Sequence, residues 1–575
     1  MQKLLSDYRR RLRSYDSVLA YSLLGVVGGI ASGLVVILFE VAIGQAAMLF
    51  GVGAGGEDFE SLPRWMLFAL PAAGATTLGI AFSLLDPQDR ETGIVHVLSR
   101  MHSHYSVLPL KNTLVQFFGG VFCLATGQSG GREGPGIHLG GAVNSLLGQR
   151  FGLPNNSLRM LIACGTAGGI AAAFQTPLAG VIFAMEVIIA EYTVVGFVPV
   201  ILAAVSASAV SRTFAVGGGL VSLPQLELAS LTELPLVMLL GLACGVAVAV
   251  FIRITHLAAG LGHWPVFLRF ALAGVLTGTL AYAVPQVLGM GYDTLSLALG
   301  GQLAVSALLL IALCKIVATA VTCGLGMPVG LIGPNLLIGA CLGGALGALV
   351  QQWLPGSSDP AVYIVIGMGA AMGAVLNAPL AAILAVVELT GTLGLSMAAL
   401  LAIVIATLTN SDLFGQRSAH QSVLSQLRRN IPEDPLSRLL HRTDVNATMD
   451  SNAVRVPVIL GEEDLVPLLE YTPAWCLIER DGDDLYLVSG SELIEWLELA
   501  LTEAEDADVT EAGIRRWSSA PVPPQATLRQ AVDTMRTQTT EAVHVLERSA
   551  STGRTILHGV VTRESIERFT LASVL

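Results

Sequence analysis

The chain has 575 residues, of which 53% are hydrophobic and 13% are charged, with a formal net charge of −12 and a mean hydropathy of +0.68. These values exclude an ordinary soluble protein and indicate a polytopic membrane protein, for which we expect no nucleic-acid partner. Apolar windows long enough to cross a bilayer recur from about residue 17 to about residue 410, and their length favours helices over a barrel.

The N-terminal segment is basic. We expect residues 1–16 to form a cytoplasmic amphipathic helix, because "YRRRLRSYD" places four arginines immediately before the first span. No cleavable signal peptide precedes that span. Arg428 and Arg429 follow the last apolar window, so we also expect the C-terminal region on the cytoplasmic side. The resulting prediction is a multi-pass protein, most simply of a bacterial inner (plasma) membrane, with both termini in the cytoplasm.

Two apolar segments about 200 residues apart read alike. They are "IACGTAGGIAAAFQTPLAGVIFAMEV" from Ile162 and "IGMGAAMGAVLNAPLAAILAVVEL" from Ile366. In each, a glycine- and alanine-rich helix ends at a proline, and an acidic residue, Glu186 or Glu388, follows nine residues after that proline. The similarity indicates internal duplication.

The duplication divides the apolar region into a first repeat, residues 17–215, a linker, 216–231, and a second repeat, 232–430. Upstream of the two similar segments lies a second matching pair, "REGPGIHLGG" and "LIGPNLLIGA". In both members a Gly-Pro step opens an apolar helix, after Gly134 in the first and after Gly333 in the second. Interrupted helices at corresponding positions of two repeats are typical of a transporter site near the bilayer midplane.

The two Gly-Pro steps carry a chemical prediction. A proline in the first helical turn has no N–H to leave unpaired, and adjacent glycines expose the free amides at the positive end of the helix. Two such helix starts, one from each repeat, would hold one anion between them. The alternative is that these small residues only allow helices to pack closely in the membrane.

These segments resemble the CLC family of chloride channels and chloride/proton antiporters. "GREGP", from Gly131 to Pro135, matches the family's gating segment, and "CKIVATAVTCGLGMPVGLIGP", from Cys314, is similar to its second anion-binding segment. The resemblance covers about residues 17–430. It implies an all-α polytopic fold with inverted repeats and broken helices, and a homodimer whose subunits each hold a pore. It also implies chloride transport without an enzymatic activity or a cofactor.

By the resemblance, Glu133 is the gating glutamate. Its carboxylate would occupy the outer anion site and leave when it is protonated or displaced by chloride, because a carboxylate at a helix N-terminus competes for the amides that an anion would use. Arg132 would then be a local counter-charge. A structural ion pair between Arg132 and another acid is the alternative.

The resemblance also implies anion ligands, some of which depart from the family pattern. Gly134 would contribute to the first helix start, and Leu331 and Ile332 to the second, where Ile332 replaces the usual phenylalanine. Thr92 stands where the family has a serine and keeps a hydroxyl. His420 stands where the family has a pore tyrosine, and an imidazole can also donate to an anion; a polar helix cap is the alternative for His420.

Proton coupling in the family often uses a second glutamate directly after the position of Glu186, but this chain has Val187 there. Glu186 itself and Glu191, one helical turn further, are the candidate proton relays. The missing glutamate favours a passive, voltage- or pH-gated chloride channel over the alternative, a chloride/proton antiporter. A bilayer and chloride are thus the expected partners in both cases, and protons only in the second.

A membrane enzyme or sensor with a regulatory tail is the remote alternative. Intramembrane catalysis would need a nucleophile–base pair or a metal-binding set such as H-E-x-x-H, and the spans contain neither. His96, His102 and His104 lie close together before Pro109, but no acids or cysteines accompany them in a ligand pattern. We interpret these histidines as a solvated polar turn and expect no metal site.

From Ile431 the chain carries 25 acidic and 12 basic residues, against 18 and 19 before it, so the charge indicates a separate soluble domain. Residues 446–575 read as two β-α-β-β-α units, 446–501 and 520–575. They resemble a pair of cystathionine-β-synthase (CBS) modules. Adenine-nucleotide binding would use Thr562, but Ser565 stands where the ribose-binding aspartate is expected, so we expect a structural role.

Overall fold

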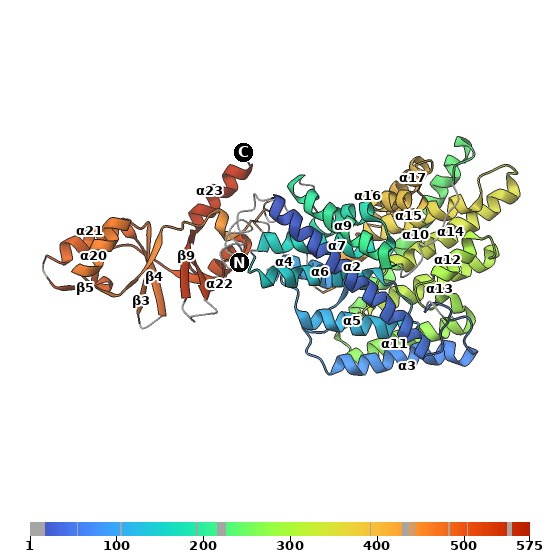
Figure 1. The fold of residues 1–575 in the computed structure, drawn as a ribbon, viewed down its shortest axis with the longest axis horizontal. Coiled ribbons are helices and arrows are strands. Elements are labelled where there is room, and N and C mark those ends of the chain that lie inside the picture. The colour runs from blue at the N-terminus through green and yellow to red at the C-terminus, as the bar shows by residue number, and fades with distance from the viewer. Residues whose placement is uncertain are drawn as a thin grey trace. The chain divides into compact units, whose positions relative to one another are not determined.

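The computed structural model divides into two compact units (Figure 1). One comprises Met1–Gly152 and Ser157–Ile431, and the other Leu153–Asn156 and Pro432–Leu575. The structure describes the following residues: 18–53, 56–103, 106–153, 155–190, 194–214, 226–391, 393–427, 436, 439–440, 443–480, 483–502, 504–548 and 555–574. The predicted N-terminal helix, residues 1–16, and Glu191 lie outside the described residues.

The first unit is helical, and its helices fall into two series in the same order. The first series is α2 (Val18–Leu49), α3 (Arg64–Ser83), α4 (Gly93–Ser103), α5 (Leu110–Ala125), α6 (Glu133–Arg150), α7 (Asn155–Phe174), α8 (Pro177–Phe183) and α9 (Val194–Phe214). The second is α10 (Leu234–Ala259), α11 (Val266–Ala283), α12 (Tyr292–Leu299), α13 (Val305–Gly324), α14 (Ile332–Trp353), α15 (Pro360–Leu376), α16 (Pro379–Thr390) and α17 (Ser396–Leu408), followed by α18 (Ala419–Gln426).

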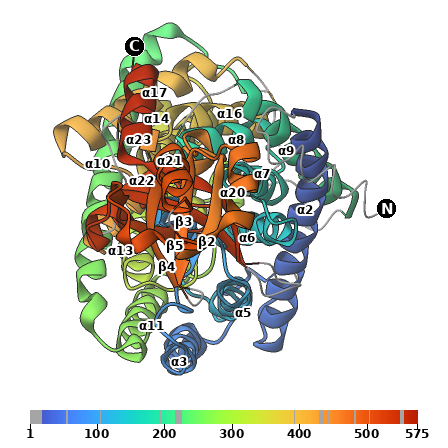
Figure 2. The same cartoon turned by 90° about the vertical axis from the view of Figure 1, so that its left-hand side faces the viewer.

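In each series the first long helix packs against the last one. In the first, α2 lies along α9, and in the second α10 lies along α17; α3 and α11 pair between the series, as both views show (Figures 1 and 2). Among the described residues, nine helices are long and apolar enough to cross a membrane. Long, uniformly apolar helices are stable in a bilayer because each satisfies its own backbone hydrogen bonds. The protein is therefore a multi-pass integral membrane protein.

Small residues set the helix contacts in both repeats. A Cβ added to Gly140 on α6 would collide with the carbonyl oxygen of Gly165 on α7, and a Cβ on Gly339 of α14 would collide with that of Gly367 on α15. Only glycine permits so close a backbone approach. These contacts bring α6 and α14 into the interior, where their first residues, Glu133 and Ile332, are buried.

The second unit is mixed α/β. It contains two β-α-β-β-α runs, as predicted: β1 (Ala453–Pro457), α20 (Glu462–Tyr471), β3 (Trp475–Arg480), β4 (Asp483–Ser489) and α21 (Gly490–Ala500), then β7 (Ser519–Val522), α22 (Leu528–Gln538), β8 (Ala542–Arg548), β9 (Thr555–Thr562) and α23 (Arg563–Val574). In each run the first strand is parallel to the second and the second is antiparallel to the third. Short strand β6 (Arg516–Trp517) pairs with β4 in the first sheet, and β2 (Ile459–Gly461) and β5 (Asp506–Asp508) form a separate antiparallel pair.

One prediction about this fold is wrong. His96 does not lie in a solvated turn: it is the fourth residue of α4 and is 1% exposed. Its burial follows from the packing of α4 against α6, and the apolar residues Ile94, Val97 and Leu98 around it were a usable signal in the sequence. Among the described residues, no group of histidine, cysteine or acidic side chains could hold a metal ion.

Candidate functional site: the meeting point of two helix starts

The loops that precede α6 and α14 are hydrogen-bonded to each other. The N–H of Gly131 donates to the carbonyl oxygen of Gly330 at 2.7 Å. In return, the N–H of Gly330 donates to the carbonyl oxygen of Gly131, also at 2.7 Å. The contact is close, since a Cβ on Gly134 would collide with the backbone of Gly330. The two Gly-Pro helix starts predicted from the repeats therefore meet.

The carboxylate of Glu133 lies between these helix starts. Its Oε2 accepts the N–H of Gly333, in the first turn of α14, at 3.3 Å, and its Oε1 accepts the hydroxyl of Tyr292. Glu133 is the first residue of α6 and is 1% exposed. A carboxylate from one repeat thus occupies the positive helix end of the other, where an anion would also be stabilised. Leu331 and Ile332, the other predicted residues of this helix start, are buried beside it.

Arg132 is not primarily the counter-charge of Glu133. Its Nε lies 3.4 Å from the Oε1 of Glu40 on α2, and its guanidinium lies 5.4 Å from the centroid of the Tyr292 ring. The alternative prediction, an ion pair with another acid, is the arrangement found. Arg132 therefore fixes the ring that donates to Glu133, through a cation–π contact, while Glu40 balances its charge.

A second acid holds the other side of Tyr292. The Oε2 of Glu57, in the segment between α2 and α3, accepts the backbone N–H of Tyr292 at 3.1 Å. Burial raises the pKa of Glu57 to about 7, an effect that Arg132 opposes and Asp293 reinforces. Glu57 lies outside the membrane-spanning helices, so a group that titrates near neutral pH adjoins the tyrosine of the site.

The predicted inner residues lie at the starts of α4 and α18, two helices that pack against each other. Thr92 is half-buried and immediately precedes α4. The N–H of Gly93, the first residue of α4, donates to Oε1 of Gln116 at 2.6 Å. His420, in the first turn of α18, is 4% exposed, and its Nδ1 has no hydrogen-bond partner among the described residues. A buried imidazole nitrogen without a protein partner is open to a ligand or a water molecule.

Glu186 has a structural partner that the sequence did not indicate. Its carboxylate oxygens accept the backbone N–H groups of Leu380 and Ala381, in the first turn of α16, at 3.3 and 2.9 Å. Glu388 does the same for the first turn of α8, accepting from Leu178 and Ala179 at 2.9 and 2.8 Å. Each acid caps a helix of the other repeat.

Tyr292, Glu40 and Glu57 are the site residues that sequence reasoning missed. Tyr292 opens α12, which occupies the same place in the second repeat that α4 occupies in the first. Aligning the two repeats element by element would have marked its position as a helix start, although not its contact with Glu133. Glu40 is one of the few charges in an otherwise apolar span, and that position was a usable signal.

Known proteins resemble this chain over the helical unit. A family model described as voltage gated chloride channel matches residues 74–411. The chain is 32% identical, over 416 residues, to the H(+)/Cl(-) exchange transporter ClcA of Vibrio cholerae serotype O1, an overlap of 70% of this chain and 88% of that protein. It is also 32% identical, over 372 residues, to a chloride channel protein named ClcB-like of Ralstonia nicotianae, an overlap of 63% and 87%.

Solved structures share the fold. A slow cyanobacterial Cl⁻/H⁺ antiporter has a TM-score of 0.63 at 22% identity, covering 71% of this chain and 97% of its own. A eukaryotic CLC transporter has a TM-score of 0.56 at 21% identity and covers 98% of both chains, so its likeness extends to the mixed α/β unit. The family match, the relatives and the shared fold show that the chain belongs to the CLC family of chloride-transporting membrane proteins and is not an enzyme.

Proposed function

We propose that the protein exchanges chloride for protons and that Glu133 takes part in the movement of both ions. The observation that carries this proposal is the position of the Glu133 carboxylate at the start of α14, where it accepts the N–H of Gly333. A carboxylate that occupies an anion site must leave before chloride can enter, and protonation removes the charge that holds it there. One group then links proton binding to chloride binding.

The relatives support exchange over passive conduction. The Vibrio cholerae protein is named as an H(+)/Cl(-) exchanger, and its aligned region covers most of its length. Passive chloride conduction, the main expectation from the sequence, is the second candidate. It is favoured by Val187, which cannot carry a proton, and by the engagement of both oxygens of Glu186 with backbone N–H groups.

We propose that the transported anion contacts Thr92 and His420 at an inner site and the amides of Gly134, Leu331 and Ile332 at the outer one. The partnerless Nδ1 of His420 supports this assignment, because a neutral imidazole can donate one N–H to an anion.

The family resemblance also supports a homodimer in a bacterial plasma membrane, with one pore in each subunit. Leu178 and Leu380, whose backbone N–H groups donate to Glu388 and Glu186, are 54% and 46% exposed. We expect both side chains to lie at the subunit contact.

The test is proton movement in proteoliposomes under an imposed chloride gradient. Exchange requires uphill proton transport that stops in Glu133→Gln, while chloride flux continues. The matched control is Glu233→Gln, because Glu233 is also a buried acid that accepts a tyrosine hydroxyl, that of Tyr363 at 2.5 Å, and a backbone N–H, that of Ser358. Chloride flux without proton movement in the unmodified protein would establish the passive channel instead.

A further inference from the structure

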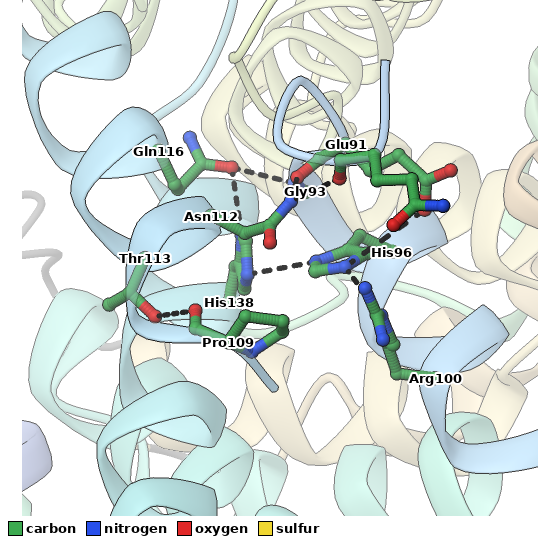
Figure 3. Close-up of polar contacts among 10 residues, drawn as sticks. Glu91, Gly93, His96, Arg100, Pro109, Asn112, Thr113, Gln116 and His138 are labelled. Atoms are coloured by element: carbon green, nitrogen blue, oxygen red, sulfur yellow. Dashed lines mark hydrogen bonds and ion pairs between the residues drawn. The ribbon is translucent and has the colours of Figure 1, made fainter. Parts of the chain in front are cut away.

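A chain of buried polar groups connects α4, α5 and α6 (Figure 3). Nε of Arg100 donates to Nε2 of His96 at 3.1 Å, Nδ1 of His96 lies 3.2 Å from Nε2 of His138, and Nδ1 of His138 lies 3.1 Å from Oε1 of Gln116. The same Oε1 accepts the N–H of Gly93. His96 and His138 are 1% and 0% exposed. The function proposed above uses neither histidine.

The groups at the two ends of this hydrogen-bonded chain determine which imidazole nitrogens carry protons. Arg100 can only donate, because a guanidinium has no acceptor. Nε2 of Gln116 donates to the carbonyl oxygen of Pro328 at 3.1 Å, so the Oε1 of Gln116 is the atom facing His138 and can only accept. Between a fixed donor and a fixed acceptor, each imidazole carries one proton, on Nδ1. Both histidines are therefore neutral in this arrangement.

One additional proton on either histidine would change the hydrogen bonds of this group of residues. A proton on Nε2 of His96 would displace Arg100 and face the carboxylate of Glu91, whose Oε2 lies 4.0 Å away. A proton on Nε2 of His138 would replace an acceptor by a donor opposite Nδ1 of His96. A buried positive charge is unfavourable without a negative partner, so the protonated pair needs an anion nearby.

At its other end, at Gln116, the hydrogen-bonded chain adjoins the start of α4, where that anion would bind. A single oxygen atom, Oε1 of Gln116, separates the Nδ1–H of His138 from the N–H of Gly93, which directly follows Thr92. We propose that His96 and His138 form a proton-binding pair whose protonation is coupled to chloride binding at the start of α4. The coupling is reciprocal: chloride favours the protonated pair, and the protonated pair favours chloride. The proposal rests on the inner anion site proposed above.

Charged and titratable groups on α2, α5 and α18, which pack against α4 or α6, lie in other contacts or at the proposed anion site. Glu40 on α2 is paired with Arg132, and Lys111 on α5 is paired with Asp89 at 3.3 Å. On α18, which also packs against α4, the titratable side chain is His420. Glu91, whose Oε2 lies 4.0 Å from Nε2 of His96, is the acid nearest to this pair in the ion pairs described.

The experiment measures proton uptake when chloride is added to detergent-purified full-length protein in weak buffer, over a series of pH values from about 4.5 to about 7.5. The background is Glu133→Gln, which removes titration of the gate. We expect chloride-dependent proton uptake, and chloride affinity, measured by calorimetry, about fivefold higher near pH 5.5 than near pH 7.5. His96→Gln and His138→Gln should abolish both effects, since glutamine can donate and accept but does not titrate. His256→Gln is the matched control, because its Nδ1 also bonds another helix, at Ser422 Oγ, 3.1 Å away.

The outcomes are separable. Chloride binding without proton uptake in the Glu133→Gln protein would overturn the coupled pair and leave the proposed transport intact. Absence of chloride binding in that protein would overturn the inner anion site itself. If a histidine variant fails to fold, Glu91→Gln tests the same proposal with both histidines present: the pH at which affinity rises should fall, and an unchanged pH profile would count against the proposal.

Discussion

Replacing Tyr292 by phenylalanine should allow the Glu133 carboxylate to leave the start of α14 more easily. The substitution removes the hydroxyl that donates to Oε1 of Glu133 and keeps the ring on which the Arg132 guanidinium lies. The carboxylate then retains the N–H of Gly333 at 3.3 Å, which is beyond the usual range for an N–H···O bond. The hydroxyl is therefore the stronger of its two described restraints.

The size of the effect follows from that lost bond. A hydrogen bond to a charged group contributes about 1.5–3 kcal/mol, which changes an equilibrium by about tenfold to a hundredfold. We expect chloride efflux from proteoliposomes at neutral pH to rise by about tenfold or more in Tyr292→Phe. Tyr282→Phe, at a 55% exposed position on α11, is the control and should leave efflux unchanged. Unchanged or slower efflux in a folded Tyr292→Phe protein would refute the reasoning.

Three further predictions concern stability and ligands. Glu186→Gln and Glu388→Gln should each lower stability by about 1–2 kcal/mol through loss of a charged helix cap, measured as similar drops in melting temperature; a loss in only one variant would contradict equivalent roles. Because the pKa of Glu57 rises from 4.5 to about 7 on burial, its stabilising contribution is full below about pH 4.5 and is lost as the pH rises through about 7. Melting temperatures should therefore fall less between pH 5 and 8 in Glu57→Gln than in the unmodified protein, and parallel curves would exclude this contribution. Calorimetry with ATP or AMP should detect no micromolar binding, because the Thr562 hydroxyl accepts the N–H of Ser565 at 3.1 Å; micromolar affinity would contradict this.

The sequence was sufficient for the repeats and for the helix starts, because both depend on local patterns. The glycines and the proline around Glu133 predict an exposed helix start wherever the chain places it, and the second repeat supplies its counterpart. The β-α-β-β-α order of the C-terminal unit followed from alternating apolar residues and turn signals in the same way. These features could be predicted because each depends only on residues that are neighbours in the sequence.

The partners of the site residues could not be predicted, because they come from distant segments. Tyr292 lies 159 residues after Glu133, and no pattern around "GYDTLSL" marks it as a donor. His96 was grouped with His102 and His104 in a polar turn, although Val95 and Val97 flank it in the sequence; its contact with His138 on another helix could not be predicted. Glu186 was expected to be a candidate proton relay, and only the position of α16 reveals that its oxygens cap that helix.

The two acids that cap helices of the opposite repeat make the same contact in opposite directions. Glu186 of the first repeat contacts the start of α16, and Glu388 of the second contacts the start of α8 in the same way. A contact in which element i meets j and j meets i is the signature of an isologous interface between two identical subunits. The two repeats thus contact each other, within one polypeptide, as the two subunits of an isologous dimer do. The two halves differ at the helix starts of the site, where the first repeat supplies Glu133 and the second supplies Tyr292, whose hydroxyl donates to it.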